Sequence, residues 1–329
     1  MNILYIIGNG FDLAMGLKTK YEHFYPYYQK CDSPNEAVKL LKKEITENTG
    51  DWSDMELALG RFSKMITSEN EFTEMYFDLS EKLADYLSQE TQRKQFTRNG
   101  KIVNDLFQPF LYLESLDRRY YKAHYDLYSD KDRNRTTVNI ITLNYSNTIE
   151  KVLGYPSNSS SKFFNTYFYV DNICHRHGVL GDTILIGVND EQQVANEVFK
   201  QSQAVRDYLI KPTAIQAMRS ENDLICKELI NKASIIILYG VSLGATDATL
   251  WNDIVQHLDS SLHPLLVYFH YSKSHIPKQR KQLLGTKETE ARELLYNRLG
   301  VPLKLQSKEK ILIGYDKEIF KKNSAVTNQ

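Results

Sequence analysis

The sequence has little cysteine. Its 329 residues contain three cysteines, Cys31, Cys174 and Cys226, which lie far apart and form no Cys-x-x-Cys pair. A zinc ribbon is therefore excluded, and an odd number of scattered thiols does not suggest a disulfide framework. Reduced thiols of a cytoplasmic protein are the simplest interpretation. We expect no metal centre.

The sequence also lacks an excess of charge and a long hydrophobic run. Lys and Arg together number 41, as do Asp and Glu. This balance argues against a global electrostatic grip on nucleic acid, although it leaves a local basic patch open. The longest apolar run, around residues 233–239, is too short to span a bilayer. The apolar first thirteen residues lack the basic start of a secretory signal, so we expect a cytoplasmic protein with no membrane partner.

Short apolar runs predict strands. Residues 3–7 form a continuous apolar run that Gly8 closes, which is typical of a buried parallel strand. Further strands are predicted over residues 138–143, 163–174, 183–188, 234–239, 265–270 and 311–314. Helices are predicted between them, over about 191–232, 247–258 and 277–299. This alternation predicts an α/β fold with a doubly wound, mostly parallel, Rossmann-like sheet.

A long helical stretch interrupts the strand pattern between residues 33 and 128. Ser33 and Pro34 resemble the N-cap and first residue of a helix, and residues 53–56 fit a capping box. An apolar stripe with helical spacing runs over 72–87, and the helical pattern continues over 104–125. We predict a helical insertion or subdomain, 33–128, within a nucleotide-binding core formed by 1–32 and 129–329.

Four polar clusters fall where predicted strands end. They are residues 8–12, 144–147, 175–178 and 240–247. Ligands of doubly wound sheets bind in the crevice at the carboxyl ends of the strands. The clusters therefore predict one binding site.

The first cluster, Gly8-Asn9-Gly10-Phe11-Asp12, resembles a nucleotide-binding turn. Glycines allow a phosphate to approach the backbone closely, and amides at a helix N-terminus favour an anion. A simple tight turn is the alternative. The acidic residue that ends the second strand of NAD-dependent dehydrogenases is missing here, so a standard dehydrogenase is not predicted.

Asn144 and His177 are the candidate catalytic residues. Asn144 directly follows a predicted strand, where it could bind a ribose hydroxyl or a water. Asn147 with Glu150 can cap the next helix, which leaves Asn144 free. His177, beside Gly178, is suited to act as a base near neutral pH, and in extended chain it shares a face with His175 while Arg176 points the other way. A structural histidine is the alternative.

Three acidic residues have competing interpretations. Glu56 is explained as the third helical residue of the capping box that begins at Ser53. Asp12 could cap the first helix or contact ligand hydroxyls, and Asp247 could cap the helix that follows the Gly240–Gly244 turn. For Asp12 and Asp247, a capping role and a ligand-binding role are both open from the sequence.

The chain resembles the AbiH-type bacterial abortive-infection proteins. The resemblance rests on the opening segment from Ile3 to Tyr21, on residues 52–56 and 142–145, on His177-Gly178, and on the segment from Tyr239 to Asp247. These segments are spread over nearly the whole chain. The resemblance implies a role in antiphage defence.

A more distant resemblance is to the sirtuin fold. It rests, in order along the chain, on Gly8, Gly10, Gly16 and Thr19, on Thr142-Leu-Asn144, on His177-Gly178, and on Gly240-Val-Ser242-Leu243. The sirtuin Asp two residues after the Asn is replaced by Ser146, and the four-cysteine zinc module is absent, which puts protein deacetylation in doubt.

The sirtuin resemblance implies hydrolysis of NAD to ADP-ribose and nicotinamide, with NAD as substrate. Asn144 would orient the ribose and the water, and His177 would act as base or hold a ribose hydroxyl. The residues implied to bind the dinucleotide are Gly8, Asn9, Gly10, Phe11, Asp12, Thr19, Gly240, Ser242, Leu243 and Asp247. The alternatives are a sensor that binds NAD or ADP-ribose without cleaving it, a toxin that cleaves nucleic acid, and a scaffold.

Toxicity and composition add two further expectations. An NAD-consuming activity would need restraint until infection, so we expect a phage-derived trigger and a controlling role for residues 33–128. The 22 tyrosines suggest self-association, because tyrosine is enriched at interfaces. We therefore expect a homo-oligomer.

Overall fold

A single mixed sheet forms the centre of the molecule. The computed structural model describes residues 1–113, 115–116, 135–156, 160–163, 166–260, 264–272, 276–306, 310–316 and 319–320. The strands within them are β1 (Asn2–Ile7), β2 (Arg135–Thr142), β3 (Ser160–Phe163), β4 (Thr166–His175), β5 (Ile235–Tyr239), β6 (Leu265–His270) and β7 (Ile311–Tyr315).

The strand order is β3-β4-β2-β1-β5-β6-β7. All neighbours pair in parallel except β3, which lies antiparallel to β4 at one edge. In chain order, β2 and β4 lie on one side of β1, and β5 then pairs with the other side of β1. The point between β1 and β5 is therefore the topological switch point of a doubly wound sheet. The predicted fold class is confirmed.

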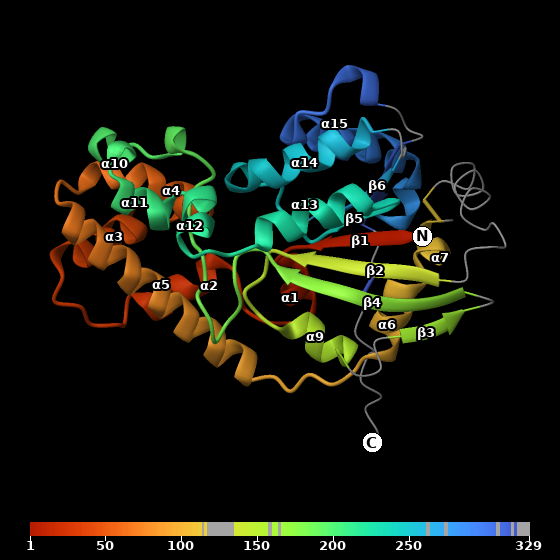
Figure 1. The fold of residues 1–329 in the computed structure, drawn as a ribbon, viewed down its shortest axis with the longest axis horizontal. Helices are drawn as coiled ribbons and strands as arrows, with labels where there is room; N and C mark the ends of the chain where they lie inside the picture. The colour runs from red at the N-terminus through yellow and green to blue at the C-terminus, as the bar shows by residue number, and fades with distance from the viewer. Residues whose placement is uncertain are drawn as a thin grey trace.

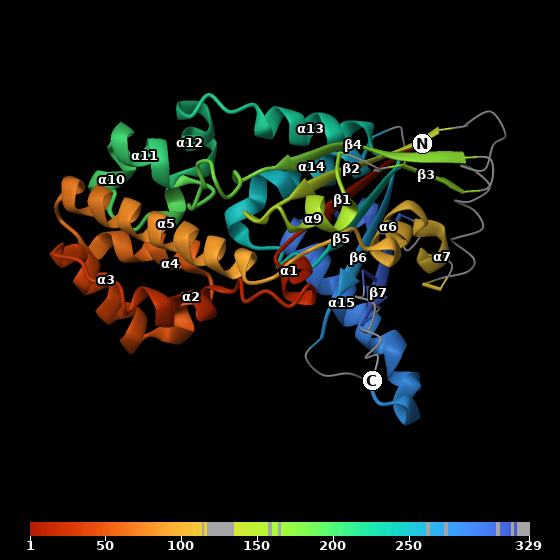
Figure 2. The same cartoon turned by 90° about the horizontal axis from the view of Figure 1, so that it is seen from below.

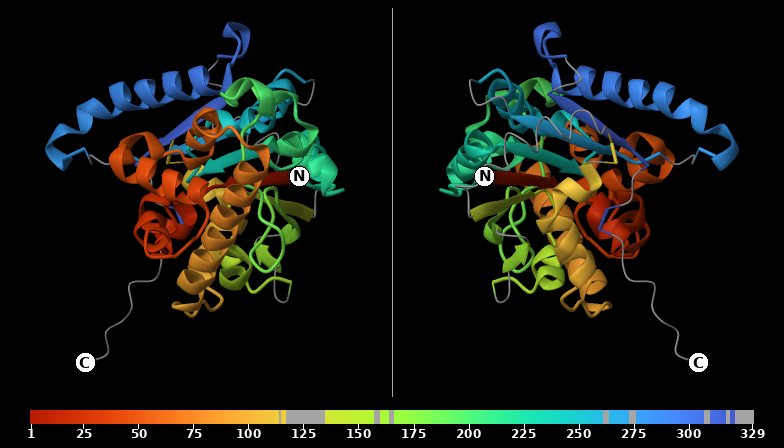
Figure 3. Two further views of the ribbon diagram at one scale, coloured as in Figure 1. Left: turned by 90° about the vertical axis from the view of Figure 1, so that its left-hand side faces the viewer. Right: turned by 90° about the vertical axis from the view of Figure 1, so that its right-hand side faces the viewer.

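Helices cover both faces of the sheet because alternate residues of each strand point to opposite sides. Leu4 and Ile6 of β1 pack with one set of helices, while Ile3, Tyr5 and Ile7 pack with the other. The first set is α13 (Asn222–Lys232), α14 (Ala248–Leu258) and α15 (Leu284–Leu299), which lie above the sheet in Figure 1. The second contains α1 (Gly10–Ala14), α6 (Gly100–Phe107), α7 (Pro109–Leu113) and α9 (Thr148–Leu153). Figure 3 shows α15, in blue, along one side of the molecule.

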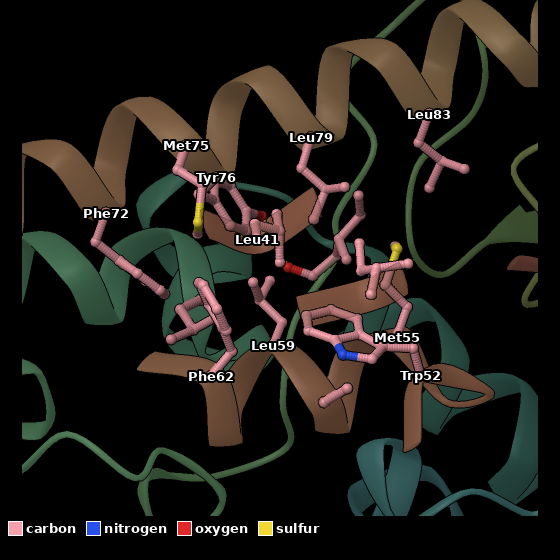
Figure 4. Close-up of a cluster of buried hydrophobic side chains, with 14 of the residues drawn as sticks. Leu41, Trp52, Met55, Leu59, Phe62, Phe72, Met75, Tyr76, Leu79 and Leu83 are labelled. Carbon is pink, nitrogen blue, oxygen red and sulfur yellow. Dashed lines mark hydrogen bonds between the residues drawn. The ribbon is translucent and has the colours of Figure 1, made fainter. Parts of the chain in front are cut away.

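A second apolar core lies outside the sheet, in what we call the helical layer. This layer consists of α2 (Tyr21–Tyr28), α3 (Glu36–Glu47), α4 (Met55–Phe62), α5 (Glu69–Gln92), α10 (Glu197–Gln201), α11 (Gln203–Leu209) and α12 (Lys211–Ala217). Its buried core is rich in aromatic rings, including Trp52, Phe62, Phe72 and Tyr76 (Figure 4). The arrowheads of β2 and β4 point toward it in Figure 1, and Figure 2 shows the same arrangement from below.

The helical layer is assembled from separate stretches of sequence. α2 precedes residue 33, α3 to α5 lie within 33–128, and α10 to α12 come much later in the chain. By contrast, α6 packs its Ile102 and Phe107 against the sheet. The division of the chain into domains stays a prediction.

Many tyrosines are used inside the molecule. The hydroxyl of Tyr76 donates to the carbonyl oxygens of Ile186 and Tyr208, at 2.8 Å and 2.9 Å. That of Tyr25 donates to the carbonyl of Trp52. Hydrogen bonds from buried tyrosines to the backbone therefore account for part of the high tyrosine content, and self-association stays a prediction.

The strand predicted over residues 183–188 is wrong. Only isolated bridges occur there, Gly178 with Ile184 and Val188 with Ile210. A short apolar run suggested a strand, but side chains satisfy part of this backbone: Tyr145 donates to the carbonyl of Leu185 and Tyr76 to that of Ile186. An extended segment whose polar groups are paired in this way needs no ladder.

Several other boundaries also differ from the predictions. The strand predicted over 163–174 is instead the end of β3 and most of β4. Asn35, not Ser33, caps α3, because its side chain accepts the amide of Val38 at 3.1 Å. The helix predicted over 104–125 begins at Gly100 and ends at Phe107, before α7, and the predicted residues 117–125 lie outside the described part of the chain.

Further short 3-10 turns connect these elements. They are η1 (Thr49–Trp52), η2 (Ser63–Met65), η3 (Glu191–Gln193), η4 (Ala245–Asp247), η5 (Lys278–Leu283) and η6 (Leu303–Leu305).

Candidate functional site

Two buried polar groups lie at the carboxyl ends of the strands. The Asp12 group follows β1, β2 and β4 and consists of Asp12, Asn144, Ser146, Glu150 and His175. The Asp247 group joins β4 and the loop after β5 to the helical layer and consists of Glu56, Arg176, His177, Lys211 and Asp247. The sequence predicted that these strand ends would meet.

Asp12 is a buried carboxyl group whose charge is poorly compensated. Its side chain follows β1 and is 2% exposed. The hydroxyl of Ser146 donates to Oδ2 at 2.6 Å, while Oδ1 has no hydrogen-bond partner among the described residues. Burial raises the pKa of Asp12 to about 6, against the opposing effect of Ser146 and Asn144. Asp12 can therefore gain or lose a proton near neutral pH.

His175 lies between two oxygen acceptors. Its Nδ1 is 3.0 Å from the carbonyl oxygen of Asn144, and its Nε2 is 2.6 Å from Glu150 Oε1. Burial works to lower the pKa of His175, but the hydrogen bond and charge of Glu150 outweigh it and raise the pKa. The capping role predicted for Asn147 and Glu150 is wrong: the Asn147 side chain makes no cap bond, and Glu150 contacts His175 instead.

Three nitrogen atoms lie close to one oxygen of Asp247. Its Oδ1 lies 3.1 Å from Arg176 Nη1, 3.3 Å from Lys211 Nζ and 2.9 Å from His177 Nε2, the last off the line of a well-formed hydrogen bond. Burial works to raise the pKa of Asp247, but Lys211, His177 and Arg176 hold it well below its usual range. Asp247 begins α14 without a side-chain cap bond, so its carboxylate serves this group instead.

His177 is a buried imidazole beside a carboxylate. Its side chain is 5% exposed. Burial and the nearby charge of Lys211 lower its pKa, with Asp247 acting in the opposite direction. A neutral imidazole next to a carboxylate can accept a proton and hold the resulting charge. This geometry is compatible with the base predicted at His177.

His175 and His177 belong to different groups, which the sequence did not predict. β4 ends at His175, so the strand alternation that would put both rings on one face stops there. Arg176 instead joins His177 at Asp247 and also donates to Asp223 Oδ1 at 2.9 Å and to Thr249 Oγ1 at 2.7 Å. Arg176 is therefore a buried part of the site.

Glu56 and Lys211 connect the helical layer to the site. Asp54, not Ser53, caps α4, so the predicted capping role of Glu56 is wrong. Glu56 Oε2 lies 2.9 Å from Lys211 Nζ, and Oε1 accepts the amide of Gly187 at 3.3 Å. Lys211 is 1% exposed; burial works to lower its pKa, but Asp247 and Glu56 raise it. Nothing in the sequence distinguishes Lys211 from other lysines.

The glycine turn brings two loops together at the switch point. The amides of Gly8 and Gly10 donate to the carbonyls of Tyr239 and Gly240, at 3.0 Å and 2.9 Å. A Cβ at Gly8 would lie 2.6 Å from the oxygen of Gly240, and one at Gly10 would lie 2.5 Å from its Cα. These glycines are therefore required by the contact between the loops. Their predicted role in binding phosphate stays a prediction.

Of the other predicted binding residues, some lie at the glycine turn after β1 and others are buried in the apolar core. Asn9 and Thr19 bond each other, the Asn9 amide donating to the carbonyl of Thr19 at 3.1 Å and the Thr19 hydroxyl to the Asn9 side chain. Phe11 is buried against Phe320. Leu243 is buried in a left-handed conformation with φ 54°, whereas Ser242 is exposed. The structure thus gives Phe11 and Leu243 packing roles.

Two further features bear on the site's chemistry. Within the described residues, no cluster of three or more His, Cys, Asp and Glu side chains could hold a metal ion. Among the helices of the same residues, none has the length and apolar character needed to cross a membrane.

Comparison with known proteins identifies the family. The model of the bacteriophage abortive infection family AbiH matches residues 4–270, which include both polar groups. No curated protein matches the chain. Since the match covers most of the sequence, from β1 to the end of β6, the chain belongs to the AbiH family of bacteriophage abortive-infection proteins.

Proposed function

We propose that this abortive-infection protein binds NAD at the carboxyl ends of β1, β2, β4 and β5 and hydrolyses its bond between nicotinamide and ribose. The observation that carries the proposal is that Asp12 with Asn144, and His177 with Asp247, lie after parallel strands whose carboxyl ends share one edge of the sheet. Dinucleotides bind at this point in sheets of the same strand order. The sirtuin resemblance supplies the choice of NAD.

The proposed reaction needs a water, a proton acceptor and support for a positively charged sugar. The glycosidic bond breaks as the oxygen of water bonds to the ribose carbon, and the bonding electrons leave with nicotinamide. Asn144 orients the ribose and the water, and Asp12 accepts a hydrogen bond from a ribose hydroxyl. His177 takes the proton of the water, and Asp247 stabilises the imidazolium that forms. The water supplies the atoms that complete ADP-ribose.

The burial of the site supports a resting state that is restrained. Asp12, Asn144, His177 and Asp247 are all less than a tenth exposed, and Glu56 and Lys211 connect the helical layer to one of them. In this proposal a phage-derived trigger moves the helical layer and admits NAD. The activity would then appear only in infected cells.

The test is NAD content and nicotinamide release in cells with and without phage, and with purified protein. The variants are His177→Ala and Asn144→Ala. The matched control is His270→Ala, because His270 also ends a sheet strand but belongs to neither group. We expect NAD loss in the wild type and the control but not in the two site variants. Growth arrest with unchanged NAD would overturn the proposal and direct attention to nucleic acid cleavage.

A second candidate is a sensor that binds NAD or ADP-ribose without cleaving it. The observation in its favour is that His177 Nε2 already contacts Asp247, and that Asp247 is shared by two cations. Calorimetric binding of NAD with no nicotinamide released, during or before infection, would favour the sensor over the hydrolase.

A further inference from the structure

The buried lysine of the Asp247 group has no assigned role. Lys211 is the first residue of α12, in the helical layer, and its Nζ lies 2.9 Å from Glu56 Oε2 and 3.3 Å from Asp247 Oδ1. Its side chain is 2% exposed, which is rare for lysine. Removing an ammonium group from water is costly unless its partners compensate. Two buried carboxylates provide that compensation here.

The same ammonium group acts on His177 through Asp247. Asp247 Oδ1 is the atom shared by Lys211, His177 and Arg176, so Lys211 and Arg176 hold the oxygen that lies 2.9 Å from His177 Nε2. Glu56 fixes Lys211 from the opposite side, and the Gly187 amide in turn fixes Glu56. A continuous chain of contacts therefore joins α4, α12 and the end of β4.

We propose that Lys211 is a positioning residue of the candidate site: its ammonium group, anchored by Glu56 of the helical layer, fixes the Asp247 carboxylate against the His177 ring. This inference rests on the proposed function for its consequence in catalysis. It goes beyond that function in making the helical layer part of the site. The helical layer covers the strand ends and supplies the Lys211 ammonium group that pairs with Asp247.

The charges around His177 make the proposal testable by titration. The groups that face its ring are Asp247 from the start of α14, Lys211 from α12 and Arg176 from the end of β4, with Glu56 beyond Lys211 and Asp223 beyond Arg176. Lys211 and Arg176 lower the pKa of His177, and Asp247 raises it. Removal of the Lys211 charge alone must therefore raise the pKa of His177.

The experiment is NMR titration of the histidine rings, with His177→Gln to assign the signal. In Lys211→Met we expect the His177 pKa to rise by about one unit or more, the usual effect of a charge at this distance. Lys211→Arg should keep it within about half a unit. The matched control is Lys227→Met, because Lys227 pairs with Asp253 at the surface and should leave the His177 pKa unchanged.

Loss of Lys211 leaves the buried Glu56 without its cation and Asp247 with Arg176 as its remaining strong cation, so a second variant guards against unfolding of the first. The double variant Glu56→Gln/Lys211→Met removes one charge of each sign and tests the same contact in a balanced site. A raised His177 pKa in the folded double variant supports the proposal. An unchanged pKa in a folded variant overturns it.

The titration does not depend on catalysis, so the two proposals can fail separately. If the wild type releases no nicotinamide, the proposed function fails while the His177 titration still decides the role of Lys211. If the wild type is active, we expect Lys211→Met to lower kcat by about tenfold or more, with KM changed less, because positioning of a base acts on the chemical step. The acidic limb of the pH–rate profile of this variant should move to higher pH, together with the His177 pKa.

Discussion

His175 and His177 are two residues apart at the end of one strand, yet their pKa values are shifted in opposite directions. His175 contacts Glu150 and a carbonyl oxygen, and its pKa is raised. His177 contacts Asp247, but Lys211 and Arg176 share the same carboxylate, and its pKa is lowered. Both rings have an acidic partner. Burial is the largest influence that lowers the pKa of His177, and Lys211 and Arg176 add to it, whereas Glu150 outweighs burial at His175.

The carboxyl groups differ in the same way. Asp12 is buried beside neutral donors, and burial raises its pKa to about 6. Asp247 is equally buried, but Lys211 and Arg176 keep its pKa well below the usual range. Pairs of titratable groups with pKa values driven apart are typical of sites that transfer protons. The two groups therefore place their acidic residues in opposite electrostatic environments.

The strongest way to break this comparison is to remove the carboxylate that the cations share. Asp247→Asn leaves Lys211 and Arg176 with much of their charge uncompensated in the interior. We expect the free energy of unfolding to fall by about 3–5 kcal/mol, measured by urea denaturation. Asp85→Asn, which changes an exposed partner of Lys82 on α5, is the control and should cost less than about 1 kcal/mol. Equal losses in the two variants would contradict the buried pairing.

The second test uses the pH dependence of stability. Because the pKa of Asp12 is about 6 when folded and about 4 when unfolded, the folded chain binds this proton more tightly. Ionisation of Asp12 therefore destabilises the fold as the pH rises from about 4 to about 6, by up to about 3 kcal/mol. The Asp12→Asn variant has no carboxyl group to ionise at this position. The free energy of unfolding of the variant minus that of the wild type should therefore increase between about pH 4 and about pH 6 and stay constant above that range. A difference that stays constant with pH, in urea denaturation at several pH values, would count against a buried acid.

A smaller effect should separate the two histidines. Glu150→Gln removes the charge that raises the pKa of His175, which we expect to fall by about one unit while that of His177 stays unchanged in NMR titration. The sign for stability follows: the charged His175 stabilises the wild type below its unfolded pKa, near 6.5, and this contribution is lost as the pH rises through the folded pKa. The variant should lack that contribution. Equal shifts of both histidines would show one coupled group rather than two.

The smallest effect sharpens the contrast between buried and exposed lysines. Lys39 pairs with Glu36 on the surface of α3, where their side chains are 55% and 80% exposed. Lys39→Met should change the free energy of unfolding by no more than about 0.5 kcal/mol, because water and salt screen such pairs. A loss as large as that of Lys211→Met, measured under the same conditions, would remove burial as the explanation for the role of Lys211.

Much of the sheet could be predicted because central parallel strands are apolar on both faces. β1, β5 and β6 are buried by helices above and below, so their sequences are continuous apolar runs that polar or glycine residues end. The same signal failed at residues 183–188, where an apolar segment packs into the helical layer and side-chain hydroxyls pair with its backbone. A short apolar run indicates burial, and burial is not limited to strands.

The sequence by itself determined which strand ends carry polar residues, and therefore that Asp12, Asn144, His177 and Asp247 would meet at one edge. Parallel strands leave no other arrangement, since their carboxyl ends lie on the same side. It also carried the AbiH signature, because family motifs are local patterns of residues.

Only the tertiary structure decided the charges of the site. Glu56 and Lys211 are 155 positions apart and Arg176 is 71 positions from Asp247, so no local pattern could indicate their contacts. A pKa depends on burial and on the charges within a few ångströms, and both are properties of packing rather than of spacing. The opposite pKa shifts of His175 and His177 follow from which side chains the fold packs around each ring.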